Sequence, residues 1–89
     1  MKIEWDEVKR LQNIAKHGID FRDAAVIFDG PVVAFENDRL DYGETRWIAL
    51  GLMQGRIIVV VYTLIGEVTR LLSARKATRY EEAGYWQNI

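Results

Sequence analysis

Basic and hydroxyl side chains gather between Ser73 and Arg79, and this run offers the clearest means of holding a phosphate. Arg75 and Lys76 follow Ser73 at the end of an apolar segment. Guanidinium and ammonium groups can stabilise the charge that develops on a phosphodiester during its cleavage. The same cluster could equally be a solvated strand end, which is the commoner role of isolated basic residues. Both interpretations stay open on spacing alone.

A second polar surface is predicted on the first helix, where Lys9, Asn13, Lys16 and His17 recur at helical spacing. His17 is the single histidine, and an imidazole can act as a general acid or base near neutral pH. It also stands just before Gly18, where a cation complements the helix dipole. Taken alone, its position favours this structural role.

Carboxylates form a third group around the Asp41 to Glu44 turn. Asp38, Asp41 and Glu44 could bind a divalent cation, and Glu44 could instead serve as a general base. Their spacing does not match an EF-hand loop, and acidic residues beside glycine are ordinary turn formers. The chain has no cysteine and one histidine, so a zinc site is not expected.

Composition limits the classes of protein to consider. The chain has 89 residues, of which 49% are hydrophobic, and this predicts one domain over residues 1–89 with its own core. A net charge of −1 argues against a protein that coats nucleic acid. Residues 1–44 carry −4 and residues 45–89 carry +3, so a local basic site remains possible. The charged N-terminus and short apolar runs predict a soluble, unexported, cytoplasmic protein.

The elements that must position these residues can be read from periodicity and from turn residues. Asp6 and Asp20 are suitable N-caps for helices over residues 6–17 and from residue 20 onward, and Thr78 with Glu81 forms a capping box for a last helix. Between them, β-branched and aromatic runs predict strands over 32–36, 45–52, 56–64 and 68–74. The predicted fold is α+β in the order ααββββα, with helices on one sheet face and the other face free.

Pairing parity predicts which side chains share a sheet face. If the hairpin loops near Gly55 and Gly66 contain even numbers of residues, four residues share one face: Trp47, Tyr62, Ser73 and Arg75. The opposite face would then carry Arg46 and Arg70 beside Ile48, Val59 and Val61. An odd loop or a bulge would reverse the assignment.

Several of these residues occur in an order and spacing typical of one known family. They are Trp5-Asp6, Lys9, Asn13, Lys16-His17-Gly18-Ile19, Phe21, Phe28-Asp29, Asp41-Tyr42-Gly43-Glu44, Arg46 and Ser73-Ala74-Arg75-Lys76-Ala77-Thr78. The motifs Lys-His-Gly, Tyr-Gly-Glu-x-Arg and Ser-Ala-Arg-Lys-Ala are jointly specific. In this pattern the chain resembles the BrnT toxins of type II toxin–antitoxin systems over nearly its whole length.

The resemblance implies a RelE-like fold and a ribonuclease that inhibits translation without a metal or other cofactor. It implies a BrnA-like antitoxin with a ribbon-helix-helix domain, a hetero-oligomeric complex, and contact with operator DNA only through that antitoxin. The 2′-hydroxyl would attack the adjacent phosphate and leave a 2′,3′-cyclic phosphate. This chemistry needs a base, an acid and cationic stabilisation.

Site residues follow from the resemblance and from the surfaces described above. Glu44 or His17 is expected as base or acid, with Arg46, Arg75 and Lys76 stabilising charge. RNA contacts are expected from Tyr62, Ser73, Arg79, Lys16 and Lys9, with Tyr62 and Ser73 as orienting or stacking groups. The parity prediction separates Arg46 from Arg75, which makes Arg46 the weaker candidate.

Two other functions compete with the toxin. A RelE-like domain without catalysis would be a binding module for an antitoxin or repressor, and the modest net charge fits it. A metal-dependent nuclease would use Asp38, Asp41 and Glu44 and would be abolished by a chelator.

Overall fold

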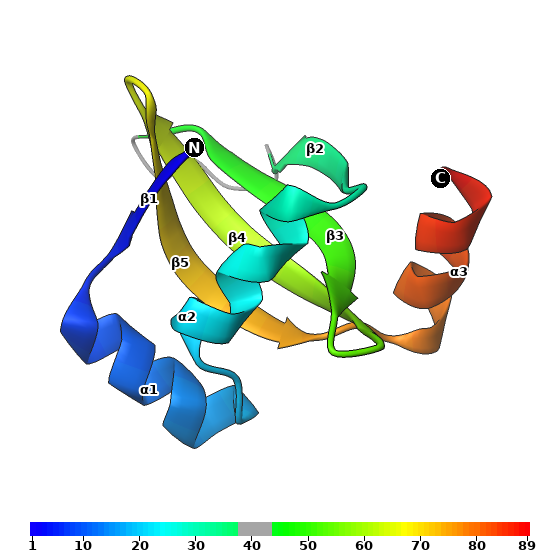
Figure 1. Cartoon of the computed structure of the whole chain (residues 1–89), viewed down its shortest axis with the longest axis horizontal. Helices are drawn as coiled ribbons and strands as arrows, with labels where there is room; N and C mark the ends of the chain where they lie inside the picture. Colours follow the sequence, from blue (N-terminus) through cyan, green and yellow to red (C-terminus); the bar gives the residue numbers. More distant parts are fainter. Residues whose placement is uncertain (38–43) are drawn as a thin grey trace.

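The computed structural model describes residues 1–37 and 44–89, and within them the chain forms one mixed sheet with helices on both faces (Figure 1). The elements in chain order are β1 (Lys2–Trp5), α1 (Glu7–His17), α2 (Phe21–Ala24), the 3-10 helix η1 (Ala25–Asp29), β2 (Val33–Asn37), β3 (Arg46–Met53), β4 (Arg56–Ile65), β5 (Val68–Lys76) and α3 (Arg79–Gln87). The strand order is β1-β5-β4-β3-β2. The α+β class is therefore confirmed.

The predicted order ααββββα is wrong at its beginning, because a strand precedes the first helix. β1 pairs in parallel with β5, and Lys2 aligns with Val68 and Trp5 with Leu71. The four predicted strands are confirmed as the antiparallel run from β2 to β5. A four-residue strand whose partner lies more than sixty residues away leaves little periodicity to detect.

The helix ends follow the predicted capping residues. The Asp6 side chain accepts a hydrogen bond of 3.1 Å from the Lys9 N–H, and Asp20 caps α2 in the same manner. α1 ends at Gly18, whose φ of 71° lies in the left-handed region that glycine adopts freely. Thr78 and Glu81 form the expected capping box at the start of α3. His17 and Arg79 are thereby fixed at helix ends.

α1 presents a different face to the sheet than its apolar residues suggested. Val8 and Leu11, two of the apolar residues of this helix, are 62% and 54% exposed. The residue that α1 buries is Asn13, which is 6% exposed and lies against β5. Polar contacts rather than apolar packing therefore attach this helix, and Asn13 does not belong to the exposed polar surface predicted for it.

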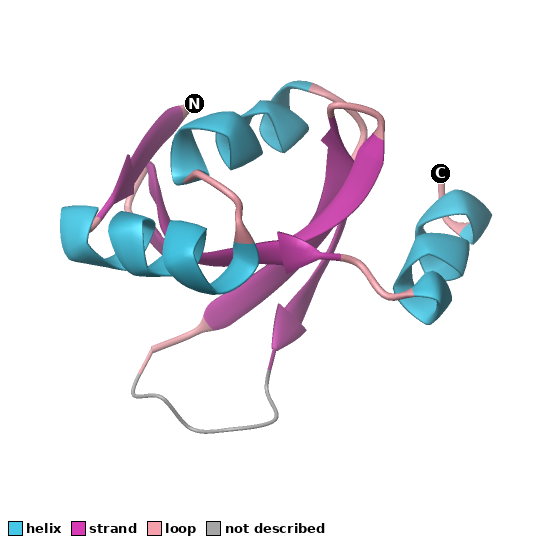
Figure 2. Ribbon diagram, turned by 90° about the horizontal axis from the view of Figure 1, so that it is seen from below, coloured by secondary structure: helices cyan, strands magenta, loops and turns pink. Residues whose placement is uncertain are grey.

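The two sheet faces carry separate cores. α2 and η1 cover the first face, where Phe21 and Ile27 pack against Ala49, Val60 and Leu71. On the second face Tyr85 of α3 packs against Leu50, Ile57 and Val59. Figure 2 shows α1 and α2 grouped together and α3 lying apart from them. The prediction that all helices cover one face is wrong for α3, which closes part of the second face.

A bulge in β5 changes the predicted distribution of side chains between faces. Both hairpin loops contain two residues, since Met53 pairs with Arg56 and Ile65 with Val68, so the condition of even-numbered loops is met. However, Val61 aligns with Ser73 and Tyr62 with Leu71, which leaves Leu72 as an extra residue. Every β5 residue after Leu72 therefore changes face relative to the prediction.

Arg75 consequently aligns with Val59, on the second face, and shares that face with Arg46. Trp47 and Tyr62 lie on the first face among the residues packed under α2 and η1. The prediction that Tyr62 and Arg75 share a face is wrong, and so is the prediction that Arg46 and Arg75 lie on opposite faces. One inserted residue accounts for both errors.

Candidate active site

A cleft of about 160 Å³ lies where the end of α1, the β3–β4 hairpin and the end of β5 meet. We call it the His17 cleft; it is lined by His17, Gly18, Ile19, Asp20, Asp23, Met53, Gln54, Arg56, Ile58 and Lys76. Local structure explains the convergence. Gly18 ends α1 directly after His17, the Gln54-Gly55 turn places Arg56 at the start of β4, and Lys76 ends β5 opposite Ile58.

A second hollow of about 180 Å³ adjoins the cleft along α1. This α1 groove is lined by Lys9, Gln12, Asn13, Lys16, His17, Leu72 and Ser73. His17 lines both hollows, so the cleft and the groove meet at the imidazole. Of the ten residues predicted to do chemistry or bind RNA, the structure brings together five: Lys9, Lys16, His17, Ser73 and Lys76.

Asn13 holds α1 against the part of β5 that β1 leaves open. β1 pairs only with residues 68–71, so the backbone of Ala74 has no strand partner on that edge. The Asn13 side chain accepts from the Ala74 N–H at 3.0 Å and donates to the Ala74 carbonyl at 2.8 Å. It also donates to the Ile19 carbonyl at 2.8 Å. One buried amide thus fixes the distance between α1, which carries His17, and β5, which carries Lys76.

Ion pairing divides the cations of the described residues into two groups. Five arginines contact carboxylates within 4.0 Å: Arg10, Arg22, Arg46, Arg70 and Arg75. The other six form no such pair with any described carboxylate: Lys2, Lys9, Lys16, Arg56, Lys76 and Arg79. All of these except Lys2 and Arg79 line the His17 cleft or the α1 groove. These four cations are therefore not held in ion pairs, although the carboxylates of Asp20 and Asp23 also line the His17 cleft.

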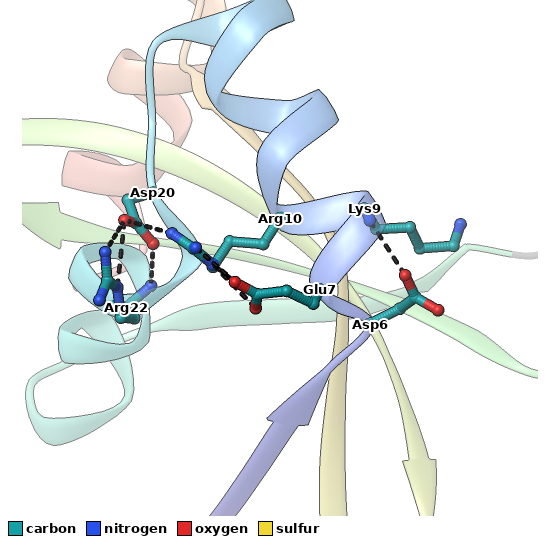
Figure 3. Close-up of polar contacts among 6 residues, drawn as sticks. All are labelled: Asp6, Glu7, Lys9, Arg10, Asp20 and Arg22. Carbon is teal, nitrogen blue, oxygen red and sulfur yellow. Dashed lines mark hydrogen bonds and ion pairs between the residues drawn. The ribbon is translucent and has the colours of Figure 1, made fainter.

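Asp20, at the wall of the His17 cleft, is occupied by structural contacts (Figure 3). Its carboxylate accepts from the Arg22 guanidinium and backbone N–H, and Arg10 reaches it at 2.9 Å while also pairing with Glu7. These contacts, chiefly those with Arg22, lower the pKa of Asp20 to about 2. The network links the middle of α1 to the start of α2 and so helps to position the cleft walls.

Glu44 and Arg46 lie at the other end of the sheet. The Arg46 Nε is 3.6 Å from the Glu44 Oε1. Arg46 aligns with Thr63 of β4, whereas Lys76 aligns with Ile58, and five strand steps separate these positions by about 17 Å. The structure therefore does not join Glu44 and Arg46 to His17 and Lys76.

Arg75 and Arg79 flank the last helix rather than the His17 cleft. Two Arg75 nitrogens contact the two Glu81 carboxylate oxygens, both at 2.8 Å, and this pairing lowers the pKa of Glu81 to about 2. The same hydrogen bonds raise the pKa of Arg75. Arg79 is exposed at the first position of α3. Arg75 therefore acts in this structure as the anchor of α3 through Glu81.

Tyr62 belongs to the core. Its side chain is packed edge to face against Phe28 with ring centroids 5.2 Å apart, the residue is 7% exposed, and burial raises the pKa of its phenol. A ring in this position has no face open to a nucleobase, so the stacking role predicted for Tyr62 does not fit its surroundings.

The metal alternative concerns residues that the structure covers only partly. Asp38 and Asp41 lie outside the described residues, and Glu44 is exposed. Within residues 1–37 and 44–89 no three His, Cys, Asp or Glu side chains are grouped as metal ligands. None of the helices in these ranges is long and apolar enough to cross a bilayer.

Comparison with models of known protein families identifies the family of this chain. The family model described as the ribonuclease toxin BrnT of type II toxin–antitoxin systems matches residues 5–81. The chain belongs to the BrnT family. The match includes every residue that lines the His17 cleft and the α1 groove, and membership of this family implies an antitoxin partner. A search of curated proteins gave no match.

Arg56 lines the His17 cleft, although the sequence analysis did not name it as a candidate site residue. The sequence predicts Arg56 only as the first residue of a strand. The geometry of the hairpins, however, also indicates which residues lie beside it. Two-residue loops align Met53 with Arg56, and the neighbouring pairing aligns Ile58 with Lys76. Counting back from the last residue of β5 therefore places Arg56 and Lys76 at the same end of their neighbouring strands.

Proposed function

We propose that this BrnT family member is an endoribonuclease toxin whose active site is the His17 cleft with the adjoining α1 groove. One observation carries the proposal: four cations without carboxylate partners among the described residues surround the chain's single histidine. Desolvated or clustered cations beside an acid–base group are suited to a phosphodiester, whose cleavage builds negative charge. Five of the six other described arginines already contact carboxylates, and Arg79 is the exception.

The proposed reaction is transesterification within RNA and requires no metal. The 2′-oxygen attacks the adjacent phosphorus, the bond from phosphorus to the 5′-oxygen breaks, and the products carry a 2′,3′-cyclic phosphate and a 5′-hydroxyl. His17 transfers a proton during this step, while Lys76 and Arg56 stabilise charge on the non-bridging oxygens. Lys9 and Lys16 bind flanking phosphates along the α1 groove, and Ser73 borders that path.

The remaining predicted residues receive different roles in this proposal. Glu44 and Arg46 form a separate pair at the start of β3, and Arg75 anchors α3. Arg79, exposed near the end of β5, is placed to contact RNA that extends beyond the cleft. Tyr62 supports the cleft from the core rather than stacking on a base.

We further propose a BrnA-like ribbon-helix-helix antitoxin as the partner, with operator DNA bound only through it. Acidic antitoxin residues laid over Lys76 and Arg56 would exclude RNA phosphates directly, because both would compete for the same cations. A structure of the complex that leaves Lys76 and His17 open to solvent would exclude direct blocking. Inhibition of translation follows in this proposal from loss of RNA integrity.

The experiment compares the wild type with His17→Ala and with Lys2→Ala, a control that removes an exposed lysine from β1, remote from the cleft. Each is expressed without the antitoxin, and growth and total RNA are followed. We expect arrest and RNA decay with the wild type and the control, and cleavage by purified His17→Ala slower by about 100-fold or more. The rate at which the wild type cleaves RNA should not change when a metal chelator is added.

Other outcomes separate the alternatives. Normal growth and intact RNA with the wild type would favour a binding module without catalysis. Cleavage abolished by a chelator would favour a metal-dependent nuclease. Loss of cleavage in Glu44→Ala but not in His17→Ala would move the active site to the start of β3.

A further inference from the structure

The proposed transesterification needs two proton-transferring groups, whereas the chain contains one imidazole. The second group must come from another side chain that borders the same cleft. Two carboxylates meet this requirement, Asp20 and Asp23, and both line the His17 cleft together with Arg56 and Lys76. Their contacts distinguish them.

Asp20 is committed to structure. It caps α2, accepts hydrogen bonds from Arg22, and pairs with Arg10, so its oxygens are already occupied by cationic and backbone donors (Figure 3). A carboxylate held in this way is a poor proton acceptor, because protonation would break the contacts that stabilise its charge. Removing it would also loosen the connection between α1 and α2.

Asp23 is available. It lies in α2 with an exposed side chain, and no ion pair or side-chain hydrogen bond joins its carboxylate to another described residue. Its backbone N–H donates to the Asp20 carbonyl at 3.0 Å, which fixes the main chain of Asp23 at the cleft wall. The cleft has a volume of about 160 Å³, and Asp23 lines it together with His17, Arg56 and Lys76.

We propose that Asp23 is the general base of the reaction and that His17 is the general acid, an inference that rests on the proposed function. The Asp23 carboxylate accepts the proton of the 2′-hydroxyl as the 2′-oxygen forms its bond to phosphorus. The protonated His17 imidazole donates a proton to the 5′-oxygen as that bond breaks. Protons and charge balance, and the products are a cyclic phosphate and a 5′-hydroxyl.

The two roles can be separated with two substrates. One is a ribodinucleotide, whose leaving 5′-oxygen needs a proton. The other is a ribonucleoside 3′-(4-nitrophenyl) phosphate, whose aryl oxide leaves without one, although its 2′-hydroxyl still needs a base. An acid is therefore dispensable only with the second substrate, and a base with neither.

The variants are Asp23→Asn, Asp23→Glu and His17→Ala, with Asp29→Asn as the matched control. Asp29 is an exposed carboxylate in η1 that lines neither the cleft nor the groove, and its change alters net charge equally. We expect Asp23→Asn to lower kcat by about 100-fold or more on both substrates, and His17→Ala to do so on the dinucleotide alone. Asp23→Glu should retain more activity than Asp23→Asn, and the control should match the wild type.

Three results would overturn the inference. The first is cleavage of both substrates by Asp23→Asn within about threefold of the wild-type rate, which removes the base role and leaves the ribonuclease proposal intact. The second is that Asp23→Asn cleaves the aryl substrate at the wild-type rate but stays slow on the dinucleotide, which would make Asp23 the acid. The third is a wild type that cleaves no RNA in any assay, and this would overturn the proposed function as well.

Discussion

Lys76 ends β5 at the wall of the cleft that contains His17, and in the proposed reaction it stabilises charge on the phosphate. We expect Lys76→Ala to lower kcat by about 100-fold, the usual effect of removing one donor that stabilises a developing oxyanion. Lys76→Arg should restore part of the rate, since it keeps the positive charge. Initial cleavage rates under saturating RNA measure both effects.

The matched control for Lys76 is Lys2→Ala, which removes the same charge from β1, where Lys2 aligns with Val68 at the opposite end of β5. Equal losses in the two lysine variants would contradict a local role, because they would point to net charge alone. A Lys76→Ala variant with an unchanged kcat and a raised KM would assign Lys76 to binding rather than to catalysis.

Residue identity predicted part of the site, and the reasons for the failures are physical. Lys9, Lys16 and His17 of α1 line the two hollows as exposed residues, and Lys76 of β5 lines the His17 cleft, whereas Asn13 of the same predicted helix surface is buried. Tyr62 was misplaced because an aromatic residue in a strand fits a core and a binding surface equally well. Arg75 offers phosphate-binding chemistry, but Glu81, one helical turn into α3, neutralises it. Sequence alone does not reveal such a pairing.

At the scale of elements, the link between α1 and β5 depends on Asn13. We expect Asn13→Ala to lower the free energy of unfolding by about 2–3 kcal/mol, because it leaves the buried N–H and carbonyl of Ala74 without their partners. Denaturant unfolding followed by tryptophan fluorescence measures the loss. The control is Gln12→Ala on the same helix, where the side chain is exposed. An equal loss in both variants would contradict this account.

α3 is attached by an ion pair whose strength depends on pH. Glu81 has its pKa lowered to about 2, chiefly by the Arg75 hydrogen bonds, so the stability it contributes is present above its ordinary value of 4.5 and is lost as pH falls from there through 2. Glu81→Gln keeps a residue suited to the capping box and removes the charge. We expect a loss of about 1 kcal/mol at neutral pH, since Arg75 is 40% exposed and partly screened.

Unfolding at several pH values tests this expectation. The difference in unfolding free energy between wild type and Glu81→Gln should shrink as pH falls below 4.5 and should be lost only below the lowered pKa of about 2. Glu82→Gln, which changes a neighbouring carboxylate with no hydrogen bond or ion pair to a described residue, should show no such convergence. A constant difference between wild type and Glu81→Gln at all pH values would exclude the ion pair as its cause.

The sequence predicted those parts of the fold that depend on neighbouring residues. The prediction failed where the contacts join residues far apart in the chain. Asp6, Gly18 and Thr78 mark helix ends through their own side chains or φ angles, and the two-residue turns fix the hairpins. β1 was missed because its partner strand comes last in the chain. The bulge at Leu72 has no sequence signature of its own, yet it reverses the face of every later residue in β5.

The whole molecule has a net charge of −1, so the RNA binding that we propose depends on a local cluster of cations rather than on overall attraction. Lys9, Lys16, Arg56 and Lys76 line the two hollows that meet at His17. If each contacts one phosphate, the logarithm of the binding constant should fall against the logarithm of salt concentration with a slope of about −3 for single-stranded RNA. Binding would weaken by about 50-fold between roughly 50 and 200 mM salt.

Fluorescence anisotropy with 2′-O-methyl RNA measures this slope without cleavage, because the nucleophilic hydroxyl is blocked. Arg56→Ala should reduce the magnitude of the slope by about 0.7, the contribution of one phosphate contact, and weaken binding to different sequences equally. Lys2→Ala should leave the slope unchanged, since Lys2 lies on β1 away from both hollows. A wild-type slope near zero would mean that the cations around His17 do not contact the RNA backbone, and the cleft would then be excluded as the RNA-binding site.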